Sequence, residues 1–159
     1  ELNFTCPASK YKLTGKDIKE AGWFFSDLSE KEYSSEKYIL KDYNTVLEGH
    51  ALCSYKGLCT NAKTGEGYKY YIYIYPNEQI AAKILEKGRE MFEEKFSLGD
   101  VNVGSSGFKI GTPFGDLAII RYGNAIIVVF GAWDVDEFAK IITDKMKRVE
   151  SEGKSVSLS

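Results

Sequence analysis

Two apolar runs around a two-residue turn constrain the fold of this chain more than any other feature. DLAIIRY, residues 116–122, is followed by Gly123 and Asn124 and then by AIIVVF, residues 125–130. Glycine and asparagine tolerate the positive φ angles that tight hairpin turns require. The pattern therefore predicts an antiparallel hairpin. Because nearly every position of AIIVVF is apolar, we expect its strand to lie in the centre of a sheet.

A longer hairpin is predicted upstream. VLEGHALCSY, residues 46–55, alternates between apolar and polar positions and suits a strand with one wet face, although a helix ending at Gly57 is an alternative. The turn-rich NAKTGEG, residues 61–67, leads into YKYYIYIY, residues 68–75. Pro76 ends the pairing because proline has no amide donor.

Each hairpin is followed by a predicted helix. Asn77 is a suitable N-cap for residues 77–96, where apolar residues recur at helical spacing and charged residues occupy the opposite face. Asp134 and Glu137 resemble a capping box at the start of the last helix, which ends near Val149.

The order hairpin then helix thus occurs twice, over residues 46–96 and 116–149. The economical fold is α+β, with a single antiparallel sheet and both helices packed on one face. We expect one domain over residues 1–149, since a chain of 159 residues holds one core. Residues 150–159, small and polar, are expected to form a flexible tail.

The N-terminal region is predicted to contain a short helix. In LTGKDIKEAGWFF, residues 13–25, Thr14 precedes Asp17 at capping distance and apolar residues follow near helical spacing. The polar residues 26–37 are expected to form a loop, and KYILKDY, residues 37–43, a short strand.

The tyrosine-rich strand provides the candidate binding site. Its period of two assigns four residues to the core, namely Tyr68, Tyr70, Ile72 and Ile74. The other face carries Lys69, Tyr71, Tyr73 and Tyr75. Three exposed tyrosines either build an ordinary wet sheet face or form a recognition surface, because tyrosine is enriched where partners meet. These four residues are the predicted binding residues.

The cysteines predict no metal site. Cys6, Cys53 and Cys59 match no zinc-binding spacing, and His50 is the only histidine. Each cysteine is either a small buried residue or part of a disulfide, in which Cys53 bridges to Cys59 or Cys6 bridges to one of them.

No cofactor and no catalytic residue are predicted. His50 would have to be the base of any Ser or Cys mechanism, but on the proposed strand it faces away from Cys53. Asp134, Asp136 and Glu137 could ligate calcium, yet a helix cap explains Asp134 and Glu137 more simply. The glycine-rich residues 97–107 lack a Walker lysine and are expected to form a plain loop.

Charge and composition limit the partners. A net charge of −2 and a pI near 5.6 provide no cationic field for nucleic acid. No apolar run reaches the roughly 18 residues of a membrane span. The lysine- and glutamate-rich composition, with Gln79 as the only glutamine, is typical of thermophilic proteins. A chain that begins at Glu1 is compatible with processing during export.

The order of elements resembles a known group of domains. YIYIY runs into NEQIAAK, and a G-D turn, IIRYGNAIIVVFG and a helix opened by DVDEF follow, over roughly residues 44–149. This order is similar to that of small exported or lipid-anchored domains of the PsbP-like and related sensor-domain type. The resemblance implies an extracytoplasmic, mostly non-enzymatic binding or accessory domain, and it identifies no catalytic residue.

Three functions are therefore considered. The first is a non-enzymatic extracytoplasmic or cell-surface binding domain that uses the tyrosine face of residues 68–75. The second is an enzyme of unfamiliar type with His50 as base. The third is a structural cell-surface module, which a self-associating edge strand would favour. A cytoplasmic location is the alternative to export.

Overall fold

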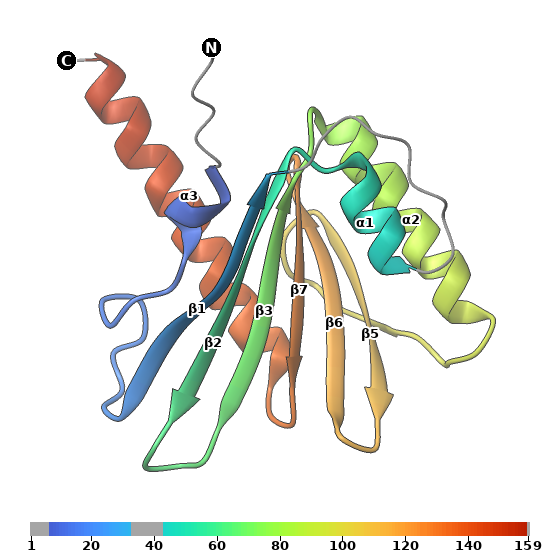
Figure 1. The fold of residues 1–159 in the computed structure, drawn as a ribbon, viewed down its shortest axis with the longest axis horizontal. Helices are drawn as coiled ribbons and strands as arrows, with labels where there is room; N and C mark the ends of the chain where they lie inside the picture. The colour runs from blue at the N-terminus through green and yellow to red at the C-terminus, as the bar shows by residue number, and fades with distance from the viewer. Residues whose placement is uncertain (1–6, 33–42, 159) are drawn as a thin grey trace.

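A seven-stranded antiparallel sheet forms the centre of the protein, with strand order β1-β2-β3-β7-β6-β5-β4 (Figure 1). The computed structural model describes residues 7–32 and 43–158. The strands are β1 (Trp23–Glu32), β2 (Cys53–Asn61), β3 (Gly67–Ile74), β4 (Gly99–Asp100), β5 (Ser106–Thr112), β6 (Gly115–Tyr122) and β7 (Ala125–Gly131). The predicted α+β class with one antiparallel sheet is confirmed, and β7 lies at its centre as expected.

Both predicted hairpins are present. Tyr122 pairs with Ala125 across the turn between β6 and β7, where Gly123 has a φ angle of 58°. This positive φ explains why the turn needs glycine. The other hairpin joins β2 to β3, with Thr60 opposite Gly67.

The helices cover both faces of the sheet, so the prediction that they pack on one face is wrong. Helices α1 (Tyr43–His50) and α2 (Glu78–Glu93) lie on one face, and α3 (Val135–Leu158) crosses the other (Figure 1). The reason lies in β7. Ile126 and Val128 are buried in the cluster that includes α2, whereas Ile127 and Val129 are buried in the cluster that includes α3. A strand that is apolar on both faces requires cover on both faces.

The predicted N-terminal helix over residues 13–25 is also wrong. The first helical element among the described residues is a 3-10 helix, η1 (Pro7–Tyr11), and β1 begins at Trp23. Strand β1 takes up most of the polar segment that was expected to be a loop, because it pairs with β2 along its length. Its register shifts between Asp27 and Ser29, which forms a bulge at Leu28.

Helix α1 replaces the first half of the strand predicted over residues 46–55. Tyr43, Val46 and Leu47, at helical spacing, are all buried in the cluster that also holds residues of α2. Strand β2 starts only at Cys53. The short strand expected over residues 37–43 falls largely on residues 33–42, which lie outside the described residues.

The caps of the two long helices agree with the sequence. Asn77 accepts a hydrogen bond from the Ile80 N–H at 2.9 Å, and Asp134 accepts one from the Glu137 N–H at 3.1 Å. Helix α3 extends to Leu158, beyond the end predicted near Val149 and through residues that were expected to form a tail.

Candidate functional site

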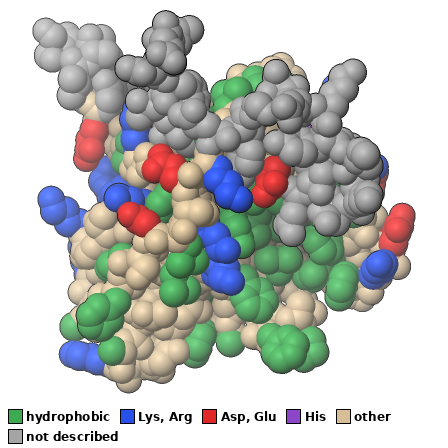
Figure 2. Space-filling model, in the orientation of Figure 1, with side chains coloured by type: hydrophobic (Ala, Val, Ile, Leu, Met, Phe, Trp, Pro, Cys, Tyr) green, Lys and Arg blue, Asp and Glu red, His purple; other side chains and the backbone are tan. Residues whose placement is uncertain are grey.

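An apolar groove lies on the face of the sheet that α1 and α2 cover. Its volume is about 840 Å³, within the range of ligand pockets. Hydrophobic side chains gather on this face, beside a group of lysine or arginine side chains (Figure 2). The lining residues are Tyr43, Leu47, Lys69, Tyr71, Tyr73, Met91, Phe92, Glu94, Lys95, Phe96, Leu117, Ile119, Val128 and Phe130.

The groove exists because the helices cover this face unevenly. Tyr75, directly after β3, and Tyr73 on β3 are buried, whereas Tyr71 is half-buried and Lys69 is exposed. Along β7, burial likewise decreases from Ile126 towards the opposite end of the strand. The helices therefore seal one end of the face and leave the other end open.

Sheet register places the lining residues side by side. Tyr71 lies opposite Val128, which lies opposite Ile119 on β6. In the next row, Lys69 lies opposite Phe130, which lies opposite Leu117. Directly opposed side chains in a sheet are about 5 Å apart, so each row forms a continuous strip of the groove floor.

A second, polar hollow adjoins the groove. Its volume is about 190 Å³. It is lined by Ser29, Lys31, Glu48, Ser54, Lys56, Tyr71 and Tyr73. The rings of Tyr71 and Tyr73 stack with their centroids 6.0 Å apart and line both hollows. These two tyrosines, the tyrosine seam, separate an apolar half of the face from a polar half.

The four predicted binding residues have different environments. Lys69, Tyr71 and Tyr73 line the groove, but Tyr73 is only 3% exposed. Tyr75 is fully buried, and its hydroxyl donates a hydrogen bond to the Leu47 carbonyl at 3.0 Å. The expectation of an exposed row of three tyrosines is therefore wrong, because α1 covers the end of the strand where Tyr75 lies.

Sequence reasoning missed most of the groove. Phe92 on α2, Leu117 on β6 and Val128 on β7 were expected to be ordinary core residues or were not singled out. The available signal was that every residue of AIIVVF is apolar, which indicates a strand with two apolar faces. Where a helix stops covering such a face depends on contacts that are distant in sequence.

On the opposite face of the sheet, the tyrosines belong to a closed core. The Tyr70 hydroxyl accepts a hydrogen bond from the Leu13 N–H at 2.9 Å, and the Tyr55 hydroxyl donates one to the Asp27 carboxylate. Burial raises the pKa of both Tyr55 and Tyr70. These phenols therefore act as neutral hydrogen-bonding groups in the core.

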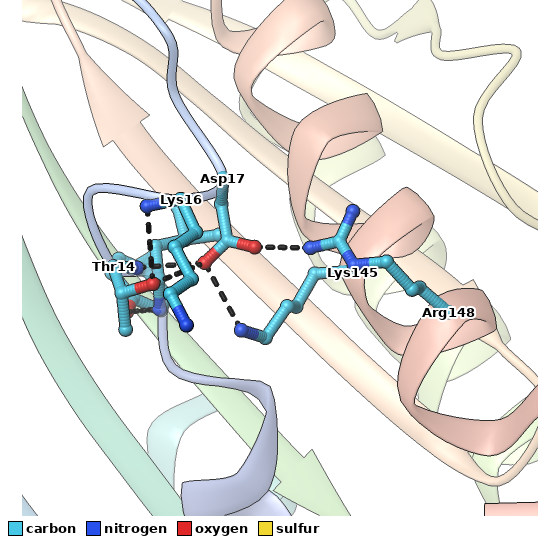
Figure 3. Close-up of polar contacts among 7 residues, drawn as sticks. Thr14, Lys16, Asp17, Lys145 and Arg148 are labelled. Carbon is cyan, nitrogen blue, oxygen red and sulfur yellow. Dashed lines mark hydrogen bonds and ion pairs between the residues drawn. The ribbon is translucent and has the colours of Figure 1, made fainter. Parts of the chain in front are cut away.

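A buried carboxylate fixes the N-terminal segment to α3 (Figure 3). Asp17, whose side chain is 2% exposed, accepts hydrogen bonds from the Thr14 N–H at 2.7 Å and from Lys145 Nζ at 3.1 Å, and it pairs with Arg148. Burial alone would raise the pKa of Asp17, but these hydrogen bonds and the Lys145 charge lower it. The Thr14–Asp17 spacing that suggested a helix start instead forms this anchor.

The structure also corrects one of the two predicted disulfide pairings. Cys59 is a free, buried thiol, so the bridge from Cys53 to Cys59 is wrong. Both residues lie on β2, where six extended residues span about 20 Å, far more than a disulfide can bridge. Burial raises the pKa of Cys59 to about 12. The alternative bridge from Cys6 involves a residue outside the described residues.

The other candidate residues have structural environments. His50 is exposed at the end of α1 rather than on a strand. Asp134 caps α3, and Asp136 pairs with Lys109 at 2.9 Å. Within the described residues, no three His, Cys, Asp or Glu side chains lie close enough together to hold a metal ion.

The glycine-rich connection contains a short strand, β4, and borders a hollow of about 370 Å³. Arg89 lines this hollow. Its guanidinium donates hydrogen bonds to the Ser106 hydroxyl at 2.8 Å and to the Gly107 carbonyl at 3.0 Å. Arg89 therefore ties the connection to α2.

None of the described helices has both the length and the apolar character needed to cross a membrane.

Comparison with known proteins gives one structural likeness. No family model matches the chain, and no curated protein matches it. The chain is similar to the crystal structure of the extracellular domain of PknH from Mycobacterium tuberculosis, with a TM-score of 0.61 and 9% sequence identity. The match covers 91% of this chain and 95% of that domain. At this identity the likeness shows a shared fold, and the resemblance to PsbP-like domains receives no support from sequence.

Proposed function

We propose that this chain is a non-enzymatic binding domain that acts outside the cytoplasm and takes its ligand into the groove beside the tyrosine seam. The observation that carries the proposal is the groove itself, an open hollow of about 840 Å³ with a largely aromatic and aliphatic lining. Sites that bind small molecules are typically concave and apolar, with a few polar groups that fix orientation.

The groove keeps most of the predicted binding residues and adds others to them. Lys69, Tyr71 and Tyr73 remain candidates, and Phe92 and Val128 join them from α2 and β7. Tyr75 does not line the groove but helps to position α1 beside it, because its hydroxyl donates a hydrogen bond to the Leu47 carbonyl.

Two observations support a location outside the cytoplasm. The fold is shared with a domain that is extracellular in PknH. The order of elements also resembles that of exported sensor-type domains. Fractionation of cells that make the natural protein would test this location, and recovery with the cytoplasmic fraction would contradict it.

Binding in the groove can be tested with N-phenyl-1-naphthylamine, a neutral dye that fluoresces in apolar sites. We expect the dye to bind the wild type with one saturable site. Tyr71→Ser should weaken binding, because it removes one wall of the groove. Phe114→Ser is the matched control, since Phe114 is 84% exposed and does not line the groove. Equal affinities for the two variants would contradict the assignment of the site.

A further inference from the structure

We propose that the groove and the polar hollow beside it form one amphipathic site for a single-chain anionic amphiphile. Its apolar chain lies over β7 and β6, and its anionic headgroup lies at the lysines of β1 and β2. This inference rests on the proposed function and adds the chemical class of the ligand.

Polarity changes in order across the sheet. One row, formed by directly paired residues on five neighbouring strands, runs Ser29, Lys56, Tyr71, Val128 and Ile119. The row therefore begins with a hydroxyl and an ammonium group, passes a phenol and ends with two aliphatic side chains. At about 4.8 Å between strands, the distance from Lys56 to Ile119 is about 14 Å.

The tyrosine seam connects the two halves. Tyr71 and Tyr73 line both the apolar groove and the polar hollow, so the two share a wall. A phenol ring offers an apolar face and a hydrogen-bonding edge, which suits the boundary between the apolar chain and the headgroup of the ligand. Lys56 Nζ lies 5.1 Å from the centroid of the Tyr71 ring, which keeps the ammonium group beside the seam.

The charge of the site differs in sign from that of the chain. The chain has a net charge of −2. The two hollows together are lined by four lysines and two glutamates, a net charge of +2; these are Lys31, Lys56, Lys69, Lys95, Glu48 and Glu94. None of the four lysines forms an ion pair with a described residue, although acidic residues are abundant on the chain.

Charge complementarity therefore favours an anionic headgroup over a neutral or cationic one. Lys31 and Lys56 line the same small hollow as Ser29 and Glu48, so two ammonium groups outnumber the one carboxylate in the space next to the seam. An anion there would form charge-assisted hydrogen bonds, which are stronger than neutral ones. The adjoining groove would remove the apolar chain of the ligand from water.

The experiment measures how three amphiphiles with the same dodecyl chain displace N-phenyl-1-naphthylamine, below their micelle concentrations. The three are dodecanoate, dodecyl maltoside and dodecyltrimethylammonium. We expect dodecanoate to bind at least roughly tenfold more tightly than the cationic amphiphile, as one additional charge-assisted hydrogen bond would give.

The double variant Lys31→Gln/Lys56→Gln should lose this preference and keep its affinity for the dye and for dodecyl maltoside. Lys87→Gln is the matched control, because Lys87 is exposed on α2 and lines neither hollow. Tyr71→Ser should weaken the binding of all three amphiphiles, because it removes a wall that both hollows share.

The outcomes separate this inference from the proposed function. Equal displacement by all three amphiphiles, or a preference that survives the double variant, would overturn the anionic headgroup and leave the groove as a binding site. Two results would overturn both proposals. One is the absence of any dye binding, and the other is sedimentation of the chain as a dimer in which the second copy closes the groove.

Discussion

The two faces of the sheet use the same residue type in different ways. On the α3 face, Tyr68 stacks on Phe138 with ring centroids 4.2 Å apart, and the Tyr70 hydroxyl is held by the Leu13 N–H. On the α1/α2 face, Tyr71 lines an open groove. All three tyrosines lie on one strand, so neither residue type nor strand decides their role.

Helix coverage makes the difference. Helix α3 and the N-terminal segment close one face around Tyr68 and Tyr70. Helices α1 and α2 close only one end of the other face, where Tyr75 is buried. An alternating strand thus predicts which residues share a face, but the cover decides which of them are available for binding.

The largest expected effect is a difference in the free energy of unfolding between variants of two neighbouring tyrosines. Tyr70→Ala should lower the free energy of unfolding by about 3–5 kcal/mol, because it empties a closed core and leaves the Leu13 N–H without its acceptor. Tyr71→Ala should cost less than about 1 kcal/mol, because its ring is half-buried in an open groove. Urea denaturation of both variants measures the difference. Similar losses would show that the two faces are equally closed.

Asp17→Asn tests the closure of the α3 face from the N-terminal side. We expect a loss of about 2–3 kcal/mol, because Lys145 and Arg148 lose a buried charged partner. Asp144→Asn, at an exposed position on α3, is the matched control and should change the stability little. A similar loss in both variants would contradict a specific role for Asp17.

The same carboxylate predicts a pH dependence. The pKa of Asp17 is lower in the folded protein, so its contribution is fully present above the unfolded pKa of about 3.9 and is lost as the pH falls through the folded pKa. Denaturation midpoints between neutral and acidic pH should therefore converge for the wild type and Asp17→Asn. A constant gap down to the lowest pH would contradict the lowered pKa.

Gly88→Ala tests the cover of the groove face. A Cβ at Gly88 would lie 2.6 Å from the ring of Tyr43, whose hydroxyl donates to the Ile84 carbonyl, so α1 must shift away from α2. We expect a loss of about 1–2 kcal/mol in urea denaturation and altered dye binding. Gly15→Ala, where a Cβ meets nothing within 4 Å, is the control. Unchanged stability and dye binding in Gly88→Ala would show that α1 does not depend on this contact.

The smallest expected effect is a difference in reactivity between a thiol on the α3 face and a thiol introduced into the groove. Cys59 is buried in the α3-face core with a pKa raised to about 12, so iodoacetamide should modify it at mildly alkaline pH only after unfolding. A cysteine introduced by Tyr71→Cys should react in the folded protein. Mass spectrometry of timed samples distinguishes the two sites, and rapid labelling of Cys59 would show that the α3 face opens readily.

The parts of the fold that follow from neighbouring residues were predictable from sequence. Gly123 and Asn124 specify a tight turn, and Asn77 specifies a helix start, through chemistry contained within a few residues. The alternation of residues 68–75 likewise assigned each tyrosine to the correct face.

The wrong predictions concern segments whose structure depends on distant partners. Residues 23–32 form β1 because β2 offers a pairing edge, not because they alternate. Residues 46–50 fit either a strand or a helix locally, and packing against α2 selects the helix. The groove depends on where two helices end over a sheet, so only two of its tyrosines and Lys69 could be proposed from sequence.

The bulge at Leu28 has a consequence for polymerisation. Strand β1, as described from Trp23 to Glu32, forms one border of the sheet, and its ladder is interrupted at that bulge. Its second half carries Glu30 and Lys31, and the opposite border, β4, spans only two residues. Irregular, charged or short borders discourage one sheet from extending into the next. Growth of a fibre by strand addition is thus disfavoured at both described borders.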